Sequence, residues 1–145
     1  ELTFLSKAAK LPSSPPLEAA ATVIEPESGH LVAVYGGTLK EATDFSRATQ
    51  ARRQAGSSFK PMVYAMAFAR SDDNGRPQWR SFDTVNNLRK VFPNTDGWRP
   101  RNNSNAYSTN STLAMGLSWS QNVATASLLE ELGGPESLID FAKSC

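Results

Sequence analysis

A serine and a lysine stand at the head of the most apolar stretch of this chain. Ser57 and Lys60 belong to Gly56-Ser57-Ser58-Phe59-Lys60-Pro61, and an apolar run over residues 62–69 follows directly. Residues three apart lie on one face of a helix, so the lysine amine could sit beside the serine hydroxyl. A hydroxyl next to an amine that can take its proton is a nucleophile with its own base.

The spacing by itself is weak, because this composition gives about 0.7 Ser-x-x-Lys matches by chance. Ser57 or Ser58 could also simply cap the helix, since a serine hydroxyl accepts a first-turn N–H. Two features favour chemistry. Gly56 leaves room for a turn that presents the hydroxyl, and a helix that is apolar nearly all round is expected to be buried. Burial disfavours the charged form of a lysine, which pushes Lys60 toward its neutral, proton-accepting form.

A second polar group lies between two apolar segments, at Ser118-Trp119-Ser120-Gln121-Asn122. Ser120 and Asn122 stand at a predicted junction between helices, so both side chains could point into one cleft. Ser-x-Asn is a common pattern, and Ser108-Thr109-Asn110 is a rival. A helix N-cap is the better interpretation for that rival. We prefer Ser120 and Asn122 because apolar helices flank them on both sides.

The elements that would position these residues follow from the apolar pattern. Two strands are predicted at residues 20–25 and 30–35 around a Pro-Glu-Ser-Gly turn, and their continuous apolar runs favour a sheet covered on both faces. Residues 71–110 read as a long polar excursion with a short strand within residues 84–91. Helices are predicted over residues 112–117 and 123–132, and a last one begins at Pro135, with inward positions Leu138, Ile139, Phe141 and Ala142.

Composition excludes several functions. The net charge of +1 predicts no nucleic-acid partner, and one cysteine and one histidine cannot build a zinc site. His30 falls at a turn, so a serine nucleophile would need a lysine as its base. No nucleotide-binding motif is present, and we expect no cofactor and no metal. Residues 1–17 have the composition of a linker, no apolar run is long enough to span a membrane, and Glu1 in place of methionine suggests a piece of a longer protein.

The chain resembles a known enzyme family. Ser-x-x-Lys followed by Ser-x-Asn is the first two-thirds of the motif set of penicillin-binding proteins and serine β-lactamases. Four segments are more specific and resemble the transpeptidase domain of class A (bifunctional) penicillin-binding proteins: Asp44–Pro61, Glu25–Gly29, Trp98–Asn102 and Ser120–Val123. The resemblance runs from about residue 19 to the end. It implies that residues 18–145 are the N-terminal portion of that domain, in an α/β (α+β type) fold with a hairpin and a helical cluster.

The resemblance also implies roles. Ser57 would be the nucleophile that attacks a D-Ala-D-Ala stem peptide of peptidoglycan or a β-lactam, and Lys60 would take its proton. Ser120 would relay a proton to the leaving amine, Asn122 would hold the substrate amide, and the Ser57 N–H would form half of an oxyanion hole. The parent protein would be anchored in the cytoplasmic membrane through an N-terminal segment, with this domain on the extracytoplasmic side.

One departure from the family matters. Its third motif, Lys-Thr-Gly or Lys-Ser-Gly on a core strand, is absent, and Lys143-Ser144-Cys145 lacks the glycine and ends a predicted helix. That strand would supply the second oxyanion donor, so the activity of this piece alone is open. Two alternatives remain: the piece is only a scaffold or interaction module, or the parent is a β-lactamase or β-lactam sensor. Missing strands would also leave a hairpin edge exposed, which could pair with a second copy.

Overall fold

The structure is a computed structural model that describes residues 18–37 and 45–145. The chain divides into two compact units, residues 1–54 and residues 55–145, and each is described by itself. The predicted linker, residues 1–17, lies outside the described residues. Within the part described, no helix has the length and apolar content needed to cross a bilayer.

The first unit contains the predicted hairpin. Strands β1 (Ala21–Ile24) and β2 (Leu31–Tyr35) pair antiparallel, within about a residue of the expected bounds. The connecting turn is closed by a hydrogen bond from the Glu25 N–H to the His30 carbonyl at 2.9 Å. All residues of both strands are exposed, so the expectation of a sheet covered on both faces is not met within this structure. The predicted pairing of this edge with a second copy stays a prediction.

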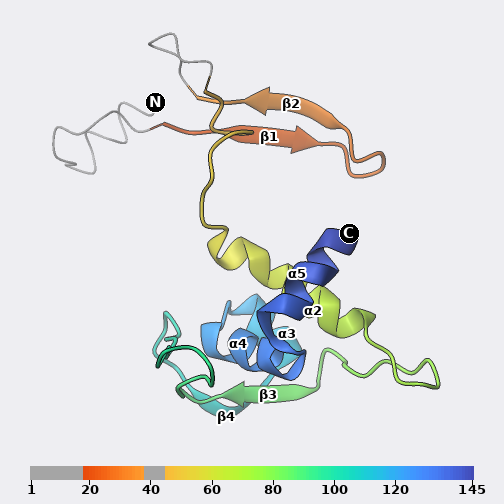
Figure 1. The fold of residues 1–145 in the computed structure, drawn as a ribbon, viewed down its shortest axis with the longest axis vertical. Coiled ribbons are helices and arrows are strands. Elements are labelled where there is room, and N and C mark those ends of the chain that lie inside the picture. Colours follow the sequence, from red (N-terminus) through yellow and green to blue (C-terminus); the bar gives the residue numbers. More distant parts are fainter. Residues whose placement is uncertain (1–17, 38–44) are drawn as a thin grey trace, which may run out of the picture. The chain divides into compact units, whose positions relative to one another are not determined.

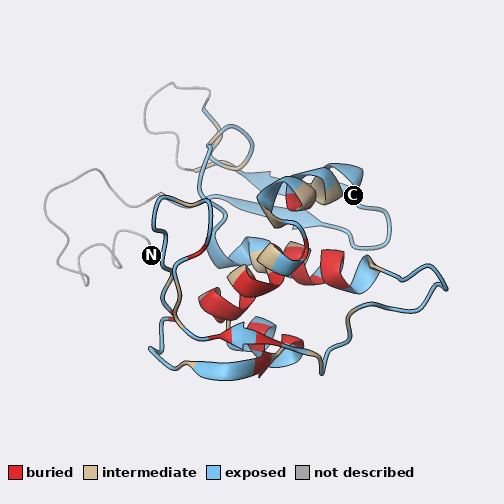
Figure 2. Ribbon diagram, turned by 60° about the horizontal axis from the view of Figure 1, so that its bottom comes forward, coloured by how far each residue is buried: buried red, intermediate tan, exposed pale blue. Residues whose placement is uncertain are grey.

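The second unit packs its helices around one core (Figure 1). The short 3₁₀ helix η1 (Gly56–Phe59) leads into α2 (Lys60–Ala69), which α3 (Leu113–Ser118), α4 (Asn122–Glu131) and α5 (Gly134–Ser144) surround. Figure 2 shows buried residues concentrated on these helices and on the adjoining small sheet. The core is apolar and draws on α2, α4 and their neighbours: Val63, Tyr64, Met66, Ala67, Val85, Leu113, Ala124, Leu128, Leu132 and Leu138. The expected burial of the α2 helix is met on one side only, because Ala65 and Phe68 are exposed.

A second small sheet covers α4. Strand β3 (Thr84–Asn87) pairs antiparallel with β4 (Ser108–Thr112), and Val85, Asn87 and Ser111 turn their side chains inward. The sequence prediction placed a strand within residues 84–91 but missed β4 and treated Ser108-Thr109-Asn110 as a helix cap. That interpretation was wrong, because these residues belong to a strand, in which Ser108 pairs with Asn87 of β3. The cap of α3 is Thr112, whose hydroxyl accepts the Met115 N–H at 3.2 Å.

The last helix departs from expectation at one position. Leu138 is buried in the core and Phe141 packs against it, as predicted, whereas Ile139 is exposed. Ile139 lies outside the buried face of this helix, because an amphipathic helix packs only one side against the core. The start of α5 follows Gly133, whose left-handed φ of +95° ends the preceding helix.

Candidate active site

Ser57 is presented at the surface by a tight turn. Gly56 takes a φ of +57°, a left-handed conformation that costs other residues free energy, and the single 3₁₀ turn that it opens exposes Ser57. The alternative that Ser57 or Ser58 caps the helix does not occur: η1 follows Ala55, α2 follows Phe59, and neither has a side-chain cap. The hydroxyl of Ser58 instead donates backwards to the Ala55 carbonyl at 2.6 Å.

Lys60 points away from the surface toward the junction between α3 and α4. Its ammonium donates to the Ser120 carbonyl at 2.6 Å, to the Ser120 hydroxyl at 2.9 Å and to Asn122 Oδ1 at 2.6 Å. These three bonds use all three donors of a protonated lysine. Partial burial lowers the pKa of Lys60 from its ordinary value of 10.5, since burial disfavours the charged form.

Ser120 owes its position to the way α3 ends. The N–H of Ser120 donates to the Leu117 carbonyl at 3.0 Å, and the N–H of Gln121 reaches back to the Gly116 carbonyl at 2.9 Å. This pair of bonds is the Schellman motif, in which the residue at the Ser120 position is left-handed and is usually glycine. Ser120 accordingly has a φ of +51°. A serine there carries strain, and strained residues cluster at functional sites.

The hydroxyl groups of Ser120 and Ser57 meet. Ser120 Oγ donates to Ser57 Oγ at 3.1 Å, while it accepts from Lys60. Among the described residues, Lys60 reaches Ser57 only through Ser120. Hydroxyl hydrogens rotate, so the direction of this chain reverses once the lysine is neutral: Ser57 can then donate to Ser120, and Ser120 to the amine. The arrangement therefore offers a two-step path by which a proton can leave Ser57.

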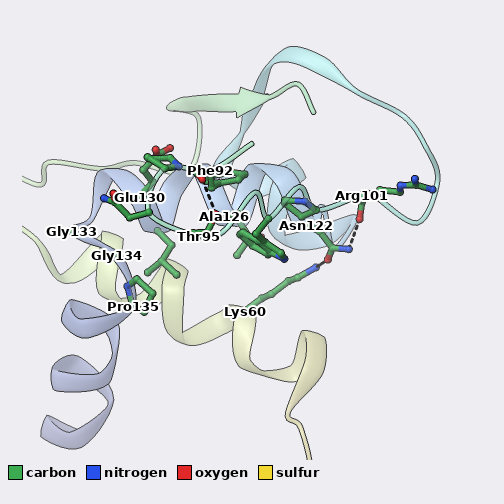
Figure 3. A pocket seen from close by; sticks show the side chains of 16 residues that line it. Lys60, Phe92, Thr95, Arg101, Asn122, Ala126, Glu130, Gly133, Gly134 and Pro135 are labelled. Atoms are coloured by element: carbon green, nitrogen blue, oxygen red, sulfur yellow. Dashed lines mark hydrogen bonds between the residues drawn. The ribbon is translucent and has the colours of Figure 1, made fainter. Parts of the chain in front are cut away.

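Asn122 is held by both ends of its amide (Figure 3). Its Oδ1 accepts from Lys60, and its Nδ2 donates to the Arg101 carbonyl at 2.7 Å. The amide therefore has a single orientation, with the oxygen on the lysine side. Ser57, Lys60, Ser120 and Asn122, which we name the four-residue cluster, thus come together as the sequence pattern suggested.

The rival polar residues lie elsewhere. Ser108 is part of strand β4, and its hydroxyl bonds to the nearby Asn110 carbonyl at 3.0 Å. Lys143 and Cys145 are exposed at the end of α5. No group of three or more His, Cys, Asp or Glu side chains gathers within residues 18–37 and 45–145, so the donors described do not form a metal centre.

Sequence reasoning missed the residues that support the Ser120–Asn122 junction through hydrogen bonds to Gln121. Thr125 Oγ1 donates to the Gln121 carbonyl at 2.8 Å and lies 3.1 Å from the buried Tyr64 hydroxyl, one turn of α2 beyond Lys60. The Ser111 hydroxyl donates to Gln121 Oε1 at 2.6 Å. The only sequence signal for these contacts was the polar residues set among apolar ones on α2 and α4. Their partners come from different elements, so spacing could not reveal them.

A cavity of about 900 Å³ adjoins the cluster (Figure 3). It runs along α4 to the start of α5, and Lys60 and Asn122 form part of its wall together with Arg101 and Glu130. Glu130 is paired with Lys90 at 2.5 Å. Ser57 and Ser120 are not among its lining residues, so the cavity neighbours the four-residue cluster and is not the space in front of the Ser57 hydroxyl.

The family is decided by comparison with known proteins. The model of the penicillin binding protein transpeptidase domain matches residues 19–144. The chain belongs to this family. Penicillin-binding protein 1A of Pseudomonas aeruginosa is 33% identical over 122 residues, covering 82% of this chain and 14% of that protein. Penicillin-binding protein 1A of Vibrio cholerae is 31% identical over 135 residues, covering 88% of this chain and 15% of that one.

Solved structures agree on the penicillin-binding protein fold. PonA1 of Mycobacterium tuberculosis in complex with penicillin V matches with a TM-score of 0.70 and 28% identity, covering 98% of this chain and 35% of that one. Penicillin-binding protein 1A of Haemophilus influenzae matches with a TM-score of 0.69 and 26% identity, covering 88% and 18%. The chain spans about one seventh of the curated relatives that it matches. It is a mixed α/β part of the penicillin-binding protein transpeptidase fold.

Proposed function

We propose that this chain carries the acylation residues of a serine-type D,D-transpeptidase that cross-links peptidoglycan. The observation that supports the proposal most is the continuous hydrogen-bond chain from Lys60 through Ser120 to the exposed Ser57. A serine becomes a nucleophile when a base can take its proton, and this chain connects the two groups. Membership of the penicillin-binding protein transpeptidase family supports a transpeptidase as the activity of the parent protein.

In the proposed reaction, Ser57 Oγ attacks the carbonyl between the two D-alanines of a stem peptide. Its proton passes to Ser120 and from Ser120 to neutral Lys60, while the carbonyl oxygen becomes an oxyanion near the Ser57 N–H. Collapse breaks the amide bond, and the proton returns through Ser120 to the departing D-alanine amine. The acyl group stays on Ser57 as an ester until an amine of a neighbouring peptidoglycan chain attacks it and forms the cross-link.

Asn122 contributes by position. Its Oδ1 keeps Lys60 directed at Ser120. When substrate binds, the side-chain amide of Asn122 would also hydrogen-bond the backbone amide of the stem peptide. A β-lactam would acylate the same serine, because its strained ring amide presents the same carbonyl. The PonA1 structure similar to this chain is a complex with penicillin V, which supports β-lactams as ligands. We place the domain on the extracytoplasmic side of a parent protein anchored in the cytoplasmic membrane.

The test is the intact mass of the chain after incubation with a penicillin. We expect an adduct of one penicillin that accumulates slowly, because the Lys-Thr-Gly motif is absent from these residues and losing one oxyanion donor typically costs about 10²–10³ in rate. The Ser57→Ala variant should carry no adduct, and Ser58→Ala is the matched control that should acylate like the unmodified chain. An adduct that persists in Ser57→Ala, or that disappears in Ser58→Ala, would contradict the assignment of the nucleophile.

Absence of an adduct from every variant would mean that these residues do not suffice for acylation. Adding a chain with the downstream part of a relative then separates the two classes of function. Recovery of the adduct identifies an incomplete enzyme, whereas continued absence favours the scaffold alternative.

A further inference from the structure

Asn102, a buried asparagine outside the four-residue cluster, contacts the elements that carry the cluster. Asn102 is only 2% exposed and lies between β3 and the N-terminus of α4. An amide buried this deeply is costly unless its polar atoms are paired. Both ends of its side-chain amide are hydrogen-bonded, and each partner belongs to a different part of the second unit.

The oxygen of Asn102 secures the start of α4. Oδ1 accepts the Val123 N–H at 3.0 Å. Val123 is in the first turn of the helix, where N–H groups have no partner within the helix. No side chain of the preceding residue Gln121 caps this helix. Asn102, distant in the sequence, therefore takes over the task that an N-cap residue usually performs.

The nitrogen of Asn102 secures the asparagine itself. Nδ2 donates to Asn87 Oδ1 at 2.8 Å and to the Ala106 carbonyl at 2.8 Å. Asn87 is buried in strand β3, which packs on α4. The amide is thus anchored to the sheet on one side and binds the helix on the other, so a shift of the helix start would break at least one of these bonds.

The neighbouring residue, Arg101, adds a second hydrogen bond to α4. The Arg101 carbonyl accepts Asn122 Nδ2 at 2.7 Å, next to the bond between Asn102 and Val123. Two successive residues of one loop therefore hold two successive residues of α4. With Nδ2 held by Arg101, the Oδ1 of Asn122 has to face Lys60, which it meets at 2.6 Å. A carbonyl stays in place only if its own peptide is fixed, and Asn102 fixes that peptide.

We propose that Asn102 is a positioning residue that sets the orientation of Asn122, and through it the direction of the Lys60 amine toward Ser120. The catalytic consequence rests on the proposed function, whereas the positional consequence does not. Errors of about 1 Å in the placement of a reacting group cost about 10²-fold in rate, so a loosened Asn122 should be visible in acylation.

Three variants test the proposal. Asn102→Ala removes every bond of the amide. Asn102→Asp keeps an oxygen for the Val123 N–H, which a negative charge at a helix start favours, but loses the donors to Asn87 and Ala106. Asn103→Ala is the matched control, because it makes the same change one residue along at an exposed position. The measurements are hydrogen exchange of the Val123 amide, the side-chain amide NMR signals of Asn122, and the rate of penicillin acylation per folded molecule.

Asn102→Ala should abolish protection of the Val123 amide, shift the Asn122 signals and slow acylation by about tenfold or more. Asn102→Asp should keep protection of the Val123 amide, because its carboxylate still accepts that N–H, but it should also shift the Asn122 signals and slow acylation, because the anchor to Asn87 and Ala106 is lost. Asn103→Ala should change nothing. Unchanged Asn122 signals in Asn102→Ala would overturn the proposal, because a residue that only stabilises the fold would leave them in place.

Each remaining outcome is also decisive. Where Asn102→Ala does not fold, unchanged Asn122 signals in folded Asn102→Asp overturn the proposal, and shifted signals support it. Where the unmodified chain forms no adduct, its residues do not suffice for acylation, yet the NMR measurements still decide whether Asn102 positions Asn122.

Discussion

At the residue scale, the backbone of Ser120 is strained and its hydroxyl lies at the centre of the cluster. Its φ of +51° is one that glycine adopts without cost, and Gly is the usual residue at this place in a Schellman motif. Serine supplies the hydroxyl that joins Lys60 to Ser57. The chain therefore has a serine, which suits this backbone conformation less well than glycine, at the position where a hydroxyl can transfer a proton.

This strain leads to a prediction about stability. Ser120→Gly and Ser120→Ala both lose the hydroxyl, so both should lose acylation by about 10²-fold or more. Ser120→Gly should nevertheless be more stable than Ser120→Ala by about 1 kcal/mol, since alanine keeps the strained left-handed conformation. Urea unfolding of the two variants measures the difference. Equal stability of the two would show that the backbone at Ser120 is not strained.

Lys60 supplies the pH dependence. Burial lowers its pKa below the ordinary 10.5, and only the neutral amine can accept a proton. Acylation should therefore rise with pH through a midpoint below 10.5. Stability should rise over the same interval, between the lowered folded pKa and 10.5, because the unfolded chain holds this proton more tightly. Titration of ¹³C-labelled lysine signals, with Lys60→Arg to assign the resonance, gives the midpoint. A value of 10.5 or above would contradict burial as the dominant effect.

At the element scale, α3 and α2 approach closely at Gly116. A Cβ added there would lie 2.5 Å from the Tyr64 hydroxyl and 3.4 Å from the Ala124 side chain. Tyr64 is buried and cannot move out, because its hydroxyl meets Thr125, which in turn bonds Gln121. The helix junction that carries Ser120 thus depends on the absence of a side chain one turn earlier.

Gly116→Ala should destabilise the chain by about 1–3 kcal/mol through overpacking, although alanine is the better helix former by about 1 kcal/mol. Tyr64→Phe removes the atom that the new methyl group would meet. The double variant Gly116→Ala with Tyr64→Phe should therefore lose less stability than the sum of the two single variants. Thermal unfolding of the four proteins completes the cycle, and additive losses would contradict a contact between these two residues.

At the scale of the whole molecule, the hairpin exposes apolar side chains on both of its faces. Val23 is 54% exposed and Val32 is 65% exposed, and each strand leaves one edge unpaired within residues 18–37. A two-stranded hairpin is marginally stable alone, and free edges invite pairing with another chain. These features support the prediction from sequence that the hairpin mediates association.

Sedimentation velocity over a range of concentrations should show reversible self-association. Val32→Lys should weaken it, because a charge on an edge strand opposes pairing. Ile139→Lys is the matched control: it makes a similar exchange of an exposed apolar residue on α5, outside the hairpin, and should leave association unchanged. A monomer at every concentration, or equal effects of the two variants, would contradict the prediction.

Much of the element order follows from local pattern. The strands of the hairpin, the α2 helix and the three C-terminal helices have apolar periodicities and flanking glycines or prolines that indicate their bounds. Strand β4 was missed because its residues Ser108–Thr112 are all polar and its pairing with β3 is not local. Ile139 was misplaced because the width of a buried face depends on what packs against it.

The sequence by itself determined which residues could do chemistry and which family they resemble, because nucleophile, base and motif spacing are properties of the chain. Tertiary structure decided how those residues are connected. It joined Lys60 to Ser57 through Ser120 rather than directly, and it placed Asn102 behind Asn122. Contacts between residues from different elements depend on how helices and strands pack, and no local pattern records that packing.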